Sequence, residues 1–324
     1  MPLGIAIDLG ATHTRAGLID RSGQILHRVS TPTPHQDIAR FLLSLIRNVA
    51  TEEEISQAVG VGISAAGPVD IQQGVLVNPP NIPLRNIALV GPLTESLGIP
   101  VYLANDCHAG IIGEAYFGAA QETENVAYVT LSTGIGGGIL SGGRIILGKK
   151  GNAAEIGHFF VDSTYNMICG CGYPGHWEGY ASGRFLLSFY RAWHIHHHKT
   201  FTEIPSIPED IFHAACEGLP NALEFMDTLG IINGRGMSDV IVAYDPELII
   251  LDGSVALHNY SHLVPLMEEH IDRFLPLPEI RLSSLDGDAP LLGASILAYG
   301  YDTSIGSLNE GGTFLFERKS EKGT

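Results

Sequence analysis

The stretch Ile5-Ala-Ile-Asp-Leu-Gly-Ala-Thr-His-Thr-Arg-Ala-Gly-Leu-Ile-Asp20 predicts two β-strands that are joined by a tight turn. Residues 5–8 are typical of a buried strand that ends at Gly10, and residues 15–20 are typical of the strand that returns. The residues between the two strands are small. We interpret the stretch as the first strand, turn and second strand of an α/β protein.

The turn itself is a candidate site for an anion. Gly10 and Ala11 leave the backbone N–H groups open to a phosphate group, and the hydroxyls of Thr12 and Thr14 add further donors. Asp8 can hold Mg²⁺ through water, because Mg²⁺ keeps much of its hydration shell. Taken alone, the same residues are also typical of an ordinary β-hairpin.

The same plan occurs a second time. Residues 125–132 are typical of a strand, residues 133–138 form a glycine-rich turn, and residues 139–140 begin the return. Such a run of glycines costs chain entropy, which favours a turn whose backbone must come close to a ligand. A flexible hairpin is the alternative. Two such halves predict a duplicated α/β architecture with a cleft between its domains.

Other segments have the periodicity of helices or strands. Apolar residues at helical spacing predict helices, and short apolar runs predict strands. The predicted helices are 37–49, 107–117, 231–243 and 291–299, and the predicted strands are 59–64, 100–104 and 248–251.

Asn105 and Asp106 lie where a predicted strand ends and a predicted helix begins. The N-terminus of a helix stabilises an ionised carboxylate, so we expect Asp106 to be charged at neutral pH. A carboxylate in this position can orient a hydroxyl group and accept its proton. The simpler alternative is a helix N-cap, a frequent role for Asn and Asp.

The segment from Glu155 to Glu178 has the most specific chemistry in the chain. His158, Cys169, Cys171 and His176 predict a closed, four-ligand zinc site with sulfur and nitrogen ligands. The two glutamates flank these ligands and are suited to bind the hydroxyls of a polyhydroxylated substrate. A glycine-rich loop with incidental cysteines is the alternative.

Composition narrows the class of protein. The net charge of −17 argues against a nucleic-acid binder, because phosphate backbones require basic patches. Asp8 comes too early for a signal peptide, and no apolar run reaches the ~20 residues that span a membrane. The protein is expected to be cytoplasmic. Cys107 and Cys216 are expected to be buried, and the tract 194–198 (His-Ile-His-His-His) is expected to be solvated and not catalytic.

Taken together, these residues resemble the ROK family of sugar kinases and repressors, within the actin/hexokinase superfamily. The resemblance covers the chain from Ile5 to about Ala298. Its motifs are the first phosphate turn at Asp8–Thr12, the sugar-side loop at Gly62–Asp70, the catalytic pair Asn105-Asp106, the second phosphate turn at Thr133–Gly138, and the adenosine region at Leu251–Ser254.

The resemblance implies a two-domain actin-like ATPase fold (ribonuclease H-like, duplicated) with an interdomain cleft. The expected domains are 1–104, with a C-terminal helix at about 291–303 packing back on it, and 105–290. The implied activity is phosphorylation of a glucose-like hexose at its 6-hydroxyl, with ATP and Mg²⁺ as cofactors, Asp106 as general base and Zn²⁺ in a structural site. A homodimer or homotetramer is the expected assembly, with no nucleic-acid or membrane partner.

The resemblance also implies a set of site residues. The expected sugar ligands are Ser64, Gly67, Asn81, Asn105, Asp106, Glu155, His158 and Glu178. The expected nucleotide-side residues are Asp8, Gly10, Ala11, Thr12, Thr14, Thr133, Gly134, Gly136 and Gly253. His158 is expected to bind zinc through one ring nitrogen and to face the sugar with the other.

The metal segment departs from the family in one position. The family pattern is Cys-x-Cys-Gly-x-x-Gly-Cys, and His176 stands in place of the last cysteine. An imidazole can replace a thiolate on zinc, which would give a Cys₂His₂ site, although the reach of the ligand and the charge of the site change.

Two other functions stay open at this point. A kinase for N-acetylmannosamine or N-acetylglucosamine would use the same catalytic residues, and the difference is expected near residues 64–67 and 78–83. A sugar-responsive repressor would carry a DNA-binding helix-turn-helix before the kinase-like body, and the first phosphate turn begins too early for one.

Overall fold

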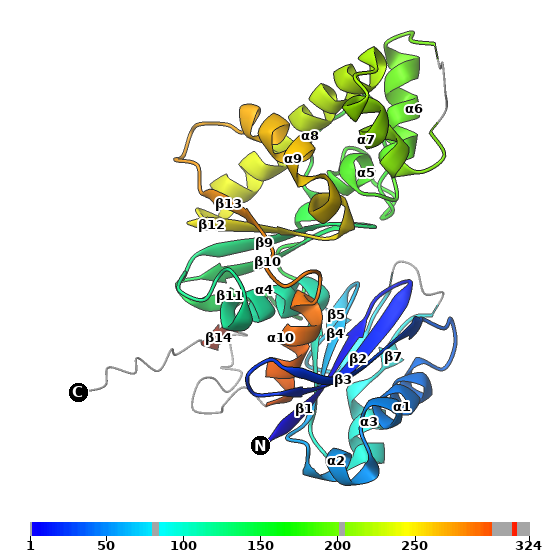
Figure 1. The fold of residues 1–324 in the computed structure, drawn as a ribbon, viewed down its shortest axis with the longest axis vertical. Helices are drawn as coiled ribbons and strands as arrows, with labels where there is room; N and C mark the ends of the chain where they lie inside the picture. The colour runs from blue at the N-terminus through cyan, green and yellow to red at the C-terminus, as the bar shows by residue number, and fades with distance from the viewer. Residues whose placement is uncertain (1, 80–83, 201–204, 300–312, 316–324) are drawn as a thin grey trace, which may run out of the picture. The chain divides into compact units, whose positions relative to one another are not determined.

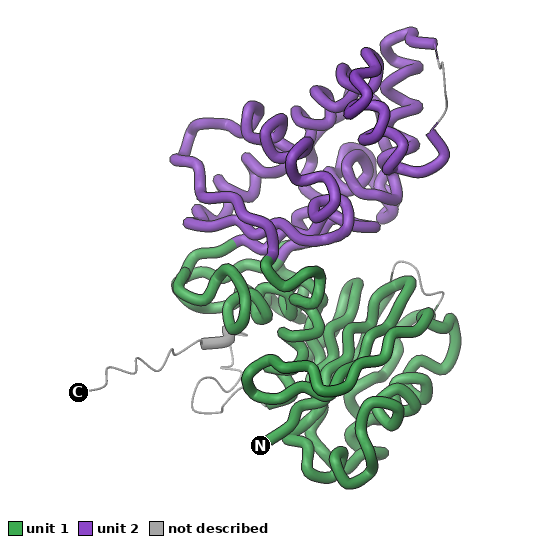
Figure 2. The backbone as a smooth tube through the Cα atoms, viewed as in Figure 1, with its two compact units in different colours: residues 1–126, 138–154, 284–324 green, residues 127–137, 155–283 purple. Residues whose placement is uncertain are grey.

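A computed structural model describes residues 2–79, 84–200, 205–299 and 313–315. The chain forms two compact units (Figure 2): unit 1 holds residues 1–126, 138–154 and 284–324, and unit 2 holds residues 127–137 and 155–283. These units differ from the expected domains 1–104 and 105–290, because residues 105–126 and 138–154 belong to unit 1.

Unit 1 is built on a five-stranded sheet with the order β3-β2-β1-β4-β8. Its strands are β1 (Leu3–Leu9), β2 (His13–Asp20), β3 (Ile25–Pro32), β4 (Val61–Ala65) and β8 (Val101–Asn105). The first three strands are antiparallel neighbours, whereas β4 pairs in parallel with β1 and β8. The expected hairpin at residues 5–20 is therefore confirmed as β1 and β2.

The two faces of this sheet are covered by different helices, which follows from the alternation of side chains along β1. Ile5, Ile7 and Leu9 lie in the main core, together with buried residues of α1 (Ile38–Val49), α2 (Glu52–Gln57) and α3 (Val90–Leu97). Ala6 lies on the opposite face, in a second cluster with residues of α10 (Ala289–Ala298). Figure 1 shows α1, α2 and α3 on one side of the sheet and α10 on the other.

Helix α10 approaches its neighbours so closely that only glycine fits at the contacts. A Cβ atom at Gly62 of β4 would lie 1.8 Å from the Ala294 carbonyl oxygen of α10. A Cβ atom at Gly293 would lie 1.7 Å from the Ala109 carbonyl oxygen of α4 (Asp106–Phe117). Helix α10 is thus held between the sheet and α4 by backbone contacts. The expectation that the last helix packs back on the N-terminal part of the chain is confirmed for its described residues.

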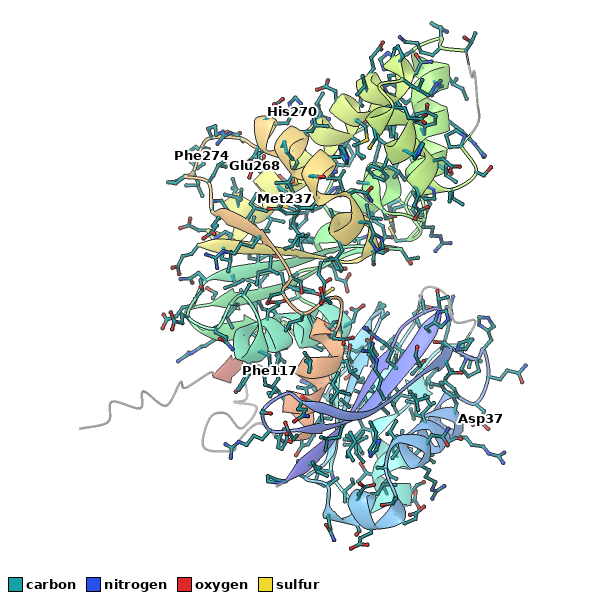
Figure 3. All side chains as sticks on the ribbon, in the orientation of Figure 1. Asp37, Phe117, Met237, Glu268, His270 and Phe274 are labelled. Carbon is teal, nitrogen blue, oxygen red and sulfur yellow. The ribbon has the colours of Figure 1, made fainter. Side chains whose placement is uncertain are left out.

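Smaller elements complete unit 1. Strands β5 (Val69–Asp70), β6 (Val75–Leu76) and β7 (Ile87–Ala88) form a small antiparallel sheet. Phe117, at the end of α4, packs against the α10 cluster (Figure 3). Its ring also lies against the turn at Gly23, where a Cβ atom would be 2.9 Å from it.

A six-stranded sheet has the order β13-β12-β9-β10-β11-β14. Its strands are β9 (Val126–Leu131), β10 (Ile135–Ser141), β11 (Arg144–Ile146), β12 (Leu248–Asp252), β13 (Glu279–Leu282) and β14 (Thr313–Leu315). The expected second strand–turn–strand unit is confirmed as β9 and β10.

The helical part of unit 2 has an aromatic core. Its helices are α5 (Glu178–Ala181), α6 (Leu186–His196), α7 (Pro208–Cys216), α8 (Pro220–Tyr244) and α9 (Ser254–Glu269), with a 3₁₀ turn at Ile156–His158. The ring centroids of Tyr180 and Phe189 lie 5.0 Å apart, and those of Phe189 and Phe225 lie 5.1 Å apart. These pairs join α5, α6 and α8 into one core.

Some sequence predictions need correction. Helix α8 begins at Pro220, eleven residues before the predicted start at 231, because Pro220 occupies its first turn, where proline is tolerated. His194 is buried, and its Nδ1 lies 3.0 Å from the Tyr190 carbonyl oxygen, so the tract 194–198 is not solvated throughout. Cys107 is buried as expected, but Cys216 is exposed.

None of the helices in the described part of the chain has both the length and the apolar character that a membrane span requires.

The contact at Gly62 leads to a test of the fold. We expect Gly62→Ala to lower the free energy of unfolding by about 3 kcal/mol or more, because the added methyl group meets backbone that cannot turn away. Gly91→Ala in α3 is the matched control, since nothing lies within 4 Å of a Cβ atom there. Residue 91 is exposed, but Pro92 follows it and disfavours helical backbone at a residue with a Cβ atom, so this control should lose only a small part of the stability that Gly62→Ala loses. Urea unfolding measures both, and equal stability of the two variants would contradict the close approach of α10.

Candidate functional site

The first phosphate turn is held in place by Thr33, the residue that follows β3. Gly10 is needed because a Cβ atom there would lie 2.6 Å from the His13 carbonyl oxygen. The Thr33 hydroxyl donates to the Gly10 carbonyl oxygen at 2.7 Å, and the Thr33 and Thr14 hydroxyl oxygens lie 2.8 Å apart. Thr14 is fully buried, so it supports the turn from inside, which differs from its expected role as a direct ligand. Ala11 and Thr12 lie toward the surface of the turn.

Asp8 is the last but one residue of β1, and both of its carboxylate oxygens accept hydrogen bonds. Arg15 donates to Oδ2 from Nε at 2.9 Å and from Nη2 at 2.6 Å, and the Ser64 hydroxyl donates to Oδ1 at 3.1 Å. Ser64 is fully buried at the end of β4. The structure therefore brings one expected sugar ligand, Ser64, together with one expected nucleotide-side residue, Asp8.

The chain between β4 and α3 is described except at residues 80–83. Gly67 has φ of 108°, a conformation that favours glycine. Asn81, another expected sugar ligand, lies outside the described residues.

Asn105 and Asp106 form the start of α4, as the sequence predicts. Asn105 is the N-cap: its side-chain oxygen accepts from the N–H groups of Cys107 at 2.9 Å and His108 at 3.4 Å. Asp106 is the first helical residue, and its Oδ1 also accepts from the Cys107 N–H at 2.9 Å. The capping role therefore belongs to Asn105, and it leaves Asp106 as a partly exposed carboxylate at the positive end of the helix dipole.

A segment that the sequence analysis missed holds this region together. Asn152 donates to the Val69 carbonyl oxygen and accepts from the Val69 N–H, both at 2.7 Å. Lys150 donates to the buried Asp70 carboxylate at 2.8 Å. His108 Nε2 donates to the Ala153 carbonyl oxygen at 3.1 Å. These bonds fasten the segment that leads into Glu155 to the end of the sugar-side loop and to α4.

In unit 2, the second phosphate turn contacts Glu178 directly. The Ile135 N–H donates to Glu178 Oε2 at 3.2 Å, and a Cβ atom at Gly134 would lie 2.7 Å from the same oxygen. Thr133 is exposed and Gly136 lies in β10. The small residue at 134 therefore lets the turn and the glutamate approach each other, and this pairs an expected nucleotide-side residue with an expected sugar ligand.

The four expected metal ligands converge. One ligand atom from each of His158, Cys169, Cys171 and His176 lies within 4.8 Å of the other three. The Nδ1 atoms of His158 and His176 are 3.3 Å apart, and Cys171 Sγ is 3.2 Å from His176 Nδ1. Two nitrogens bound to one tetrahedral zinc lie about 3.3 Å apart. These residues therefore fit a zinc ion, and His176 takes the place that the third cysteine has in the family pattern.

The titration of the cluster is set by burial. Burial raises the pKa of the Cys169 thiol to about 12, so metal binding there must displace a proton. Burial and the neighbouring His158 lower the pKa of His176, which favours the neutral imidazole that binds metals. Burial is also the main cause that raises the pKa of Glu155, and Glu178 adds to it.

A buried tryptophan anchors the metal segment. Trp177 lies between His176 and Glu178 in the sequence and is fully buried. Its indole N–H donates to Asn233 Oδ1 of α8 at 2.8 Å, and a Cβ atom at Gly236 would lie 2.3 Å from its ring. The sequence analysis did not single out this residue, although a tryptophan inside a glycine-rich loop indicates an anchor. Trp177 therefore anchors its sequence neighbours His176 and Glu178 to α8.

Gly253 closes the nucleotide-side set in unit 2. It follows β12 with φ of 90°, and a Cβ atom there would lie 2.5 Å from the Leu131 carbonyl oxygen of β9. The buried Asp252 accepts from the Gly253 N–H at 2.6 Å and from the Tyr128 hydroxyl at 2.6 Å. Only glycine fits where β9 and β12 end.

Comparisons with known proteins show which family the chain resembles over most of its length. The model of the ROK family matches residues 4–300. A glucokinase from Pyrobaculum calidifontis is 39% identical over 297 residues, which cover 91% of this chain and 94% of the relative. A ROK family glucokinase from Streptomyces griseus, solved in complex with glucose and AMPPNP, has a TM-score of 0.75 at 31% identity and covers 91% of this chain and 98% of its own. A ROK hexokinase from Thermus thermophilus has a TM-score of 0.76 at 31% identity, with 92% and 98% covered.

His108 predicts how stability depends on pH. Burial lowers its pKa to about 4, and its Nδ1 has no hydrogen-bond partner among the residues that the structure describes. The unfolded chain has a histidine pKa of about 6.5, so between these two values the unfolded state binds a proton that the folded state does not. The contribution of His108 to the free energy of unfolding is therefore fully present above about pH 6.5, and it falls by about 1.4 kcal/mol per pH unit as the pH drops toward 4.

Denaturant unfolding at pH 7.5, 6 and 5 measures this slope. His108→Gln keeps an N–H donor for the Ala153 carbonyl oxygen but does not titrate, so it should lose less stability than the wild type on acidification. The same loss in both proteins would show that His108 is not held neutral by the fold.

Proposed function

This chain belongs to the ROK family, and from that premise we propose that it transfers the γ-phosphoryl group of ATP to the 6-hydroxyl of glucose. The family, the two-domain actin-like ATPase fold and the sugar kinase activity follow from the matches over nearly the whole chain. Glucose as the substrate rests on the glucokinase relatives, among them the one solved with glucose and AMPPNP. The mechanism is inferred from the position of Asp106 at the start of α4.

Asp106 is proposed as the general base. It is the first residue of α4, where the N–H groups of the first turn favour the ionised carboxylate. Asn105 takes over the capping of that helix, so capping does not require Asp106. In the reaction, one Asp106 oxygen orients the sugar hydroxyl and accepts its proton as the new O–P bond forms.

Glu155, His158 and Glu178 are proposed to bind the other sugar hydroxyls. His158 turns its Nδ1 to the metal cluster, which leaves Nε2 for the sugar. Glu178 accepts from the Ile135 N–H at 3.2 Å, and this bond holds one of its carboxylate oxygens toward the second phosphate turn. Neutral hydroxyls suit these carboxylates, because each hydroxyl can donate one hydrogen bond.

The residues proposed to bind the nucleotide come from both units. They are Gly10, Ala11 and Thr12 in unit 1, and Thr133, Gly134, Gly136 and Gly253 in unit 2. Their common property is a small side chain or a hydroxyl beside backbone N–H groups. Mg²⁺, when bound, neutralises charge on the phosphates.

The Cys₂His₂ cluster is proposed to hold a structural zinc ion. When bound, zinc links the loop at His158 to the loop at Cys169–His176 and completes its four-ligand site with no position for a substrate. The role of the metal is then to fix His158 and its neighbours, not to take part in phosphoryl transfer.

An N-acetylhexosamine is the alternative substrate. Its acetamide pocket is expected near residues 64–67 and 78–83, and residues 80–83 lie outside the described part of the chain. Homo-oligomer formation and a cytoplasmic location stay predictions.

An ADP-release assay tests the function. With glucose, mannose, N-acetylglucosamine and N-acetylmannosamine at equal concentrations, we expect the highest kcat/KM for glucose. The highest value for an N-acetylhexosamine would replace the proposed substrate, and turnover with none of them would contradict kinase activity.

The same assay tests the base. Asp106→Asn should lower kcat with glucose by about 10²–10⁴-fold and change the Kd for ATP little, because the amide cannot accept the proton. Asp37→Asn is the matched control (Figure 3): Asp37 is exposed and has φ of 50°, a conformation that asparagine tolerates. Retained turnover in Asp106→Asn would remove this residue as the base.

Metal analysis tests the zinc site. We expect about one zinc per purified chain, loss of zinc and a lower Tm in His176→Ala, and retention of zinc in His176→Cys, which restores the ligand of the family pattern. An active wild-type protein without metal would contradict the structural site.

A further inference from the structure

Asp8 is the first member of a chain of alternating charges in unit 1. Arg15 donates to Asp8 from two nitrogens, and its third nitrogen, Nη1, donates to Asp288 Oδ1 at 2.9 Å. Arg28 then donates to both oxygens of Asp288, at 2.7 and 2.8 Å. The order is carboxylate, guanidinium, carboxylate, guanidinium, so the four charges cancel.

This chain of charges rests on rigid elements. Asp8 and Arg15 are opposite each other in the β1–β2 pair, and Arg28 lies on β3. Asp288 is the N-cap residue of α10, whose position is fixed by the glycine contacts to β4 and α4. Asp288 thereby fixes the outer side of Arg15, and Arg15 in turn fixes Asp8.

The arrangement does not fit direct binding of a divalent cation by Asp8. A cation that binds Oδ2 would have to displace Arg15, whose Nε and Nη2 already donate to that oxygen. Oδ1 accepts one hydrogen bond, from Ser64, and keeps one lone pair, so the obstacle there is the positive charge of Arg15. The guanidinium also repels a second positive charge, and at 8% exposure Asp8 has little water to screen that repulsion.

We propose that Arg15 is a positioning residue that masks Asp8, so that the nucleotide-free protein does not bind a divalent cation at Asp8. Under the proposed function, on which this inference rests for the role of Asp8, Mg²⁺ then reaches the site with ATP, and Asp8 contacts it only through water. Asp288 contributes by holding Arg15 in place. Arg28 acts on Asp288 alone, so it should matter little to the masking.

Binding of Mn²⁺ to the nucleotide-free protein tests this proposal, with electron paramagnetic resonance to count free Mn²⁺. Arg15→Gln removes the positive charge and should bind Mn²⁺ at least about tenfold more tightly than the wild type. Arg15→Lys keeps the charge and should bind as weakly as the wild type. Arg28→Gln, the matched control for loss of a surface arginine charge, should also resemble the wild type.

Asp8→Asn in the Arg15→Gln background should abolish the gain, which locates the new site at Asp8. Thermal unfolding of each variant shows whether it is folded. If Arg15→Gln does not fold, Arg15→Lys still tests the role of the charge, because tight Mn²⁺ binding by folded Arg15→Lys would overturn the proposal. Equal affinities of wild type and folded Arg15→Gln would also overturn it. Kinase activity is measured separately, so a protein without turnover but with the expected Mn²⁺ pattern would refute the proposed function and support this inference.

Discussion

The structure of unit 1 depends on how closely helix α10 approaches its neighbours. Gly62 in β4 and Gly293 in α10 remove the side chains that would keep the backbones apart. As a result, one short helix touches both β4, the strand that carries Ser64, and α4, the helix that begins at Asp106. Its own N-cap residue, Asp288, reaches the salt bridge of Asp8. Residues from the two ends of the chain are therefore placed relative to one another by backbone contact, which is stiffer than contact through long side chains.

The same principle holds within unit 2 with different residues. His176 and Glu178 lie on either side of Trp177, whose buried ring and indole hydrogen bond to Asn233 tie them to α8. Glu178 in turn meets the second phosphate turn at Ile135. Residues that are expected to bind ligands, such as His176 and Glu178, are thus held in place by residues with no expected ligand, such as Trp177 and Asn233.

Much of this could be predicted from the sequence where local pattern and chemistry agree. The hairpin at β1 and β2, the pair Asn105-Asp106 at the start of a helix and the Cys/His cluster were recognisable, because residues close in the sequence have the relevant spacing. Two contacts were missed because the partners lie far apart in the sequence and meet only in the fold. They are the ion pair of Arg15 with Asp288 and the hydrogen bonds of Asn152 with Val69. The burial of Thr14 could not be predicted, because its position in the turn does not reveal that its side chain points inward, toward Thr33.

The position of Trp177 has a consequence for how the protein would respond to its metal. In small zinc modules, the ion supplies the energy that folds the chain, and the apo form is a random coil. Here, the aromatic core and the bond to Asn233 order the loop through groups that do not touch the metal. Metal binding would then add stability to a loop that is already ordered and would not be required for the domain to fold. A change of ligand in the cluster would alter its affinity for metal without the loss of the domain that carries it.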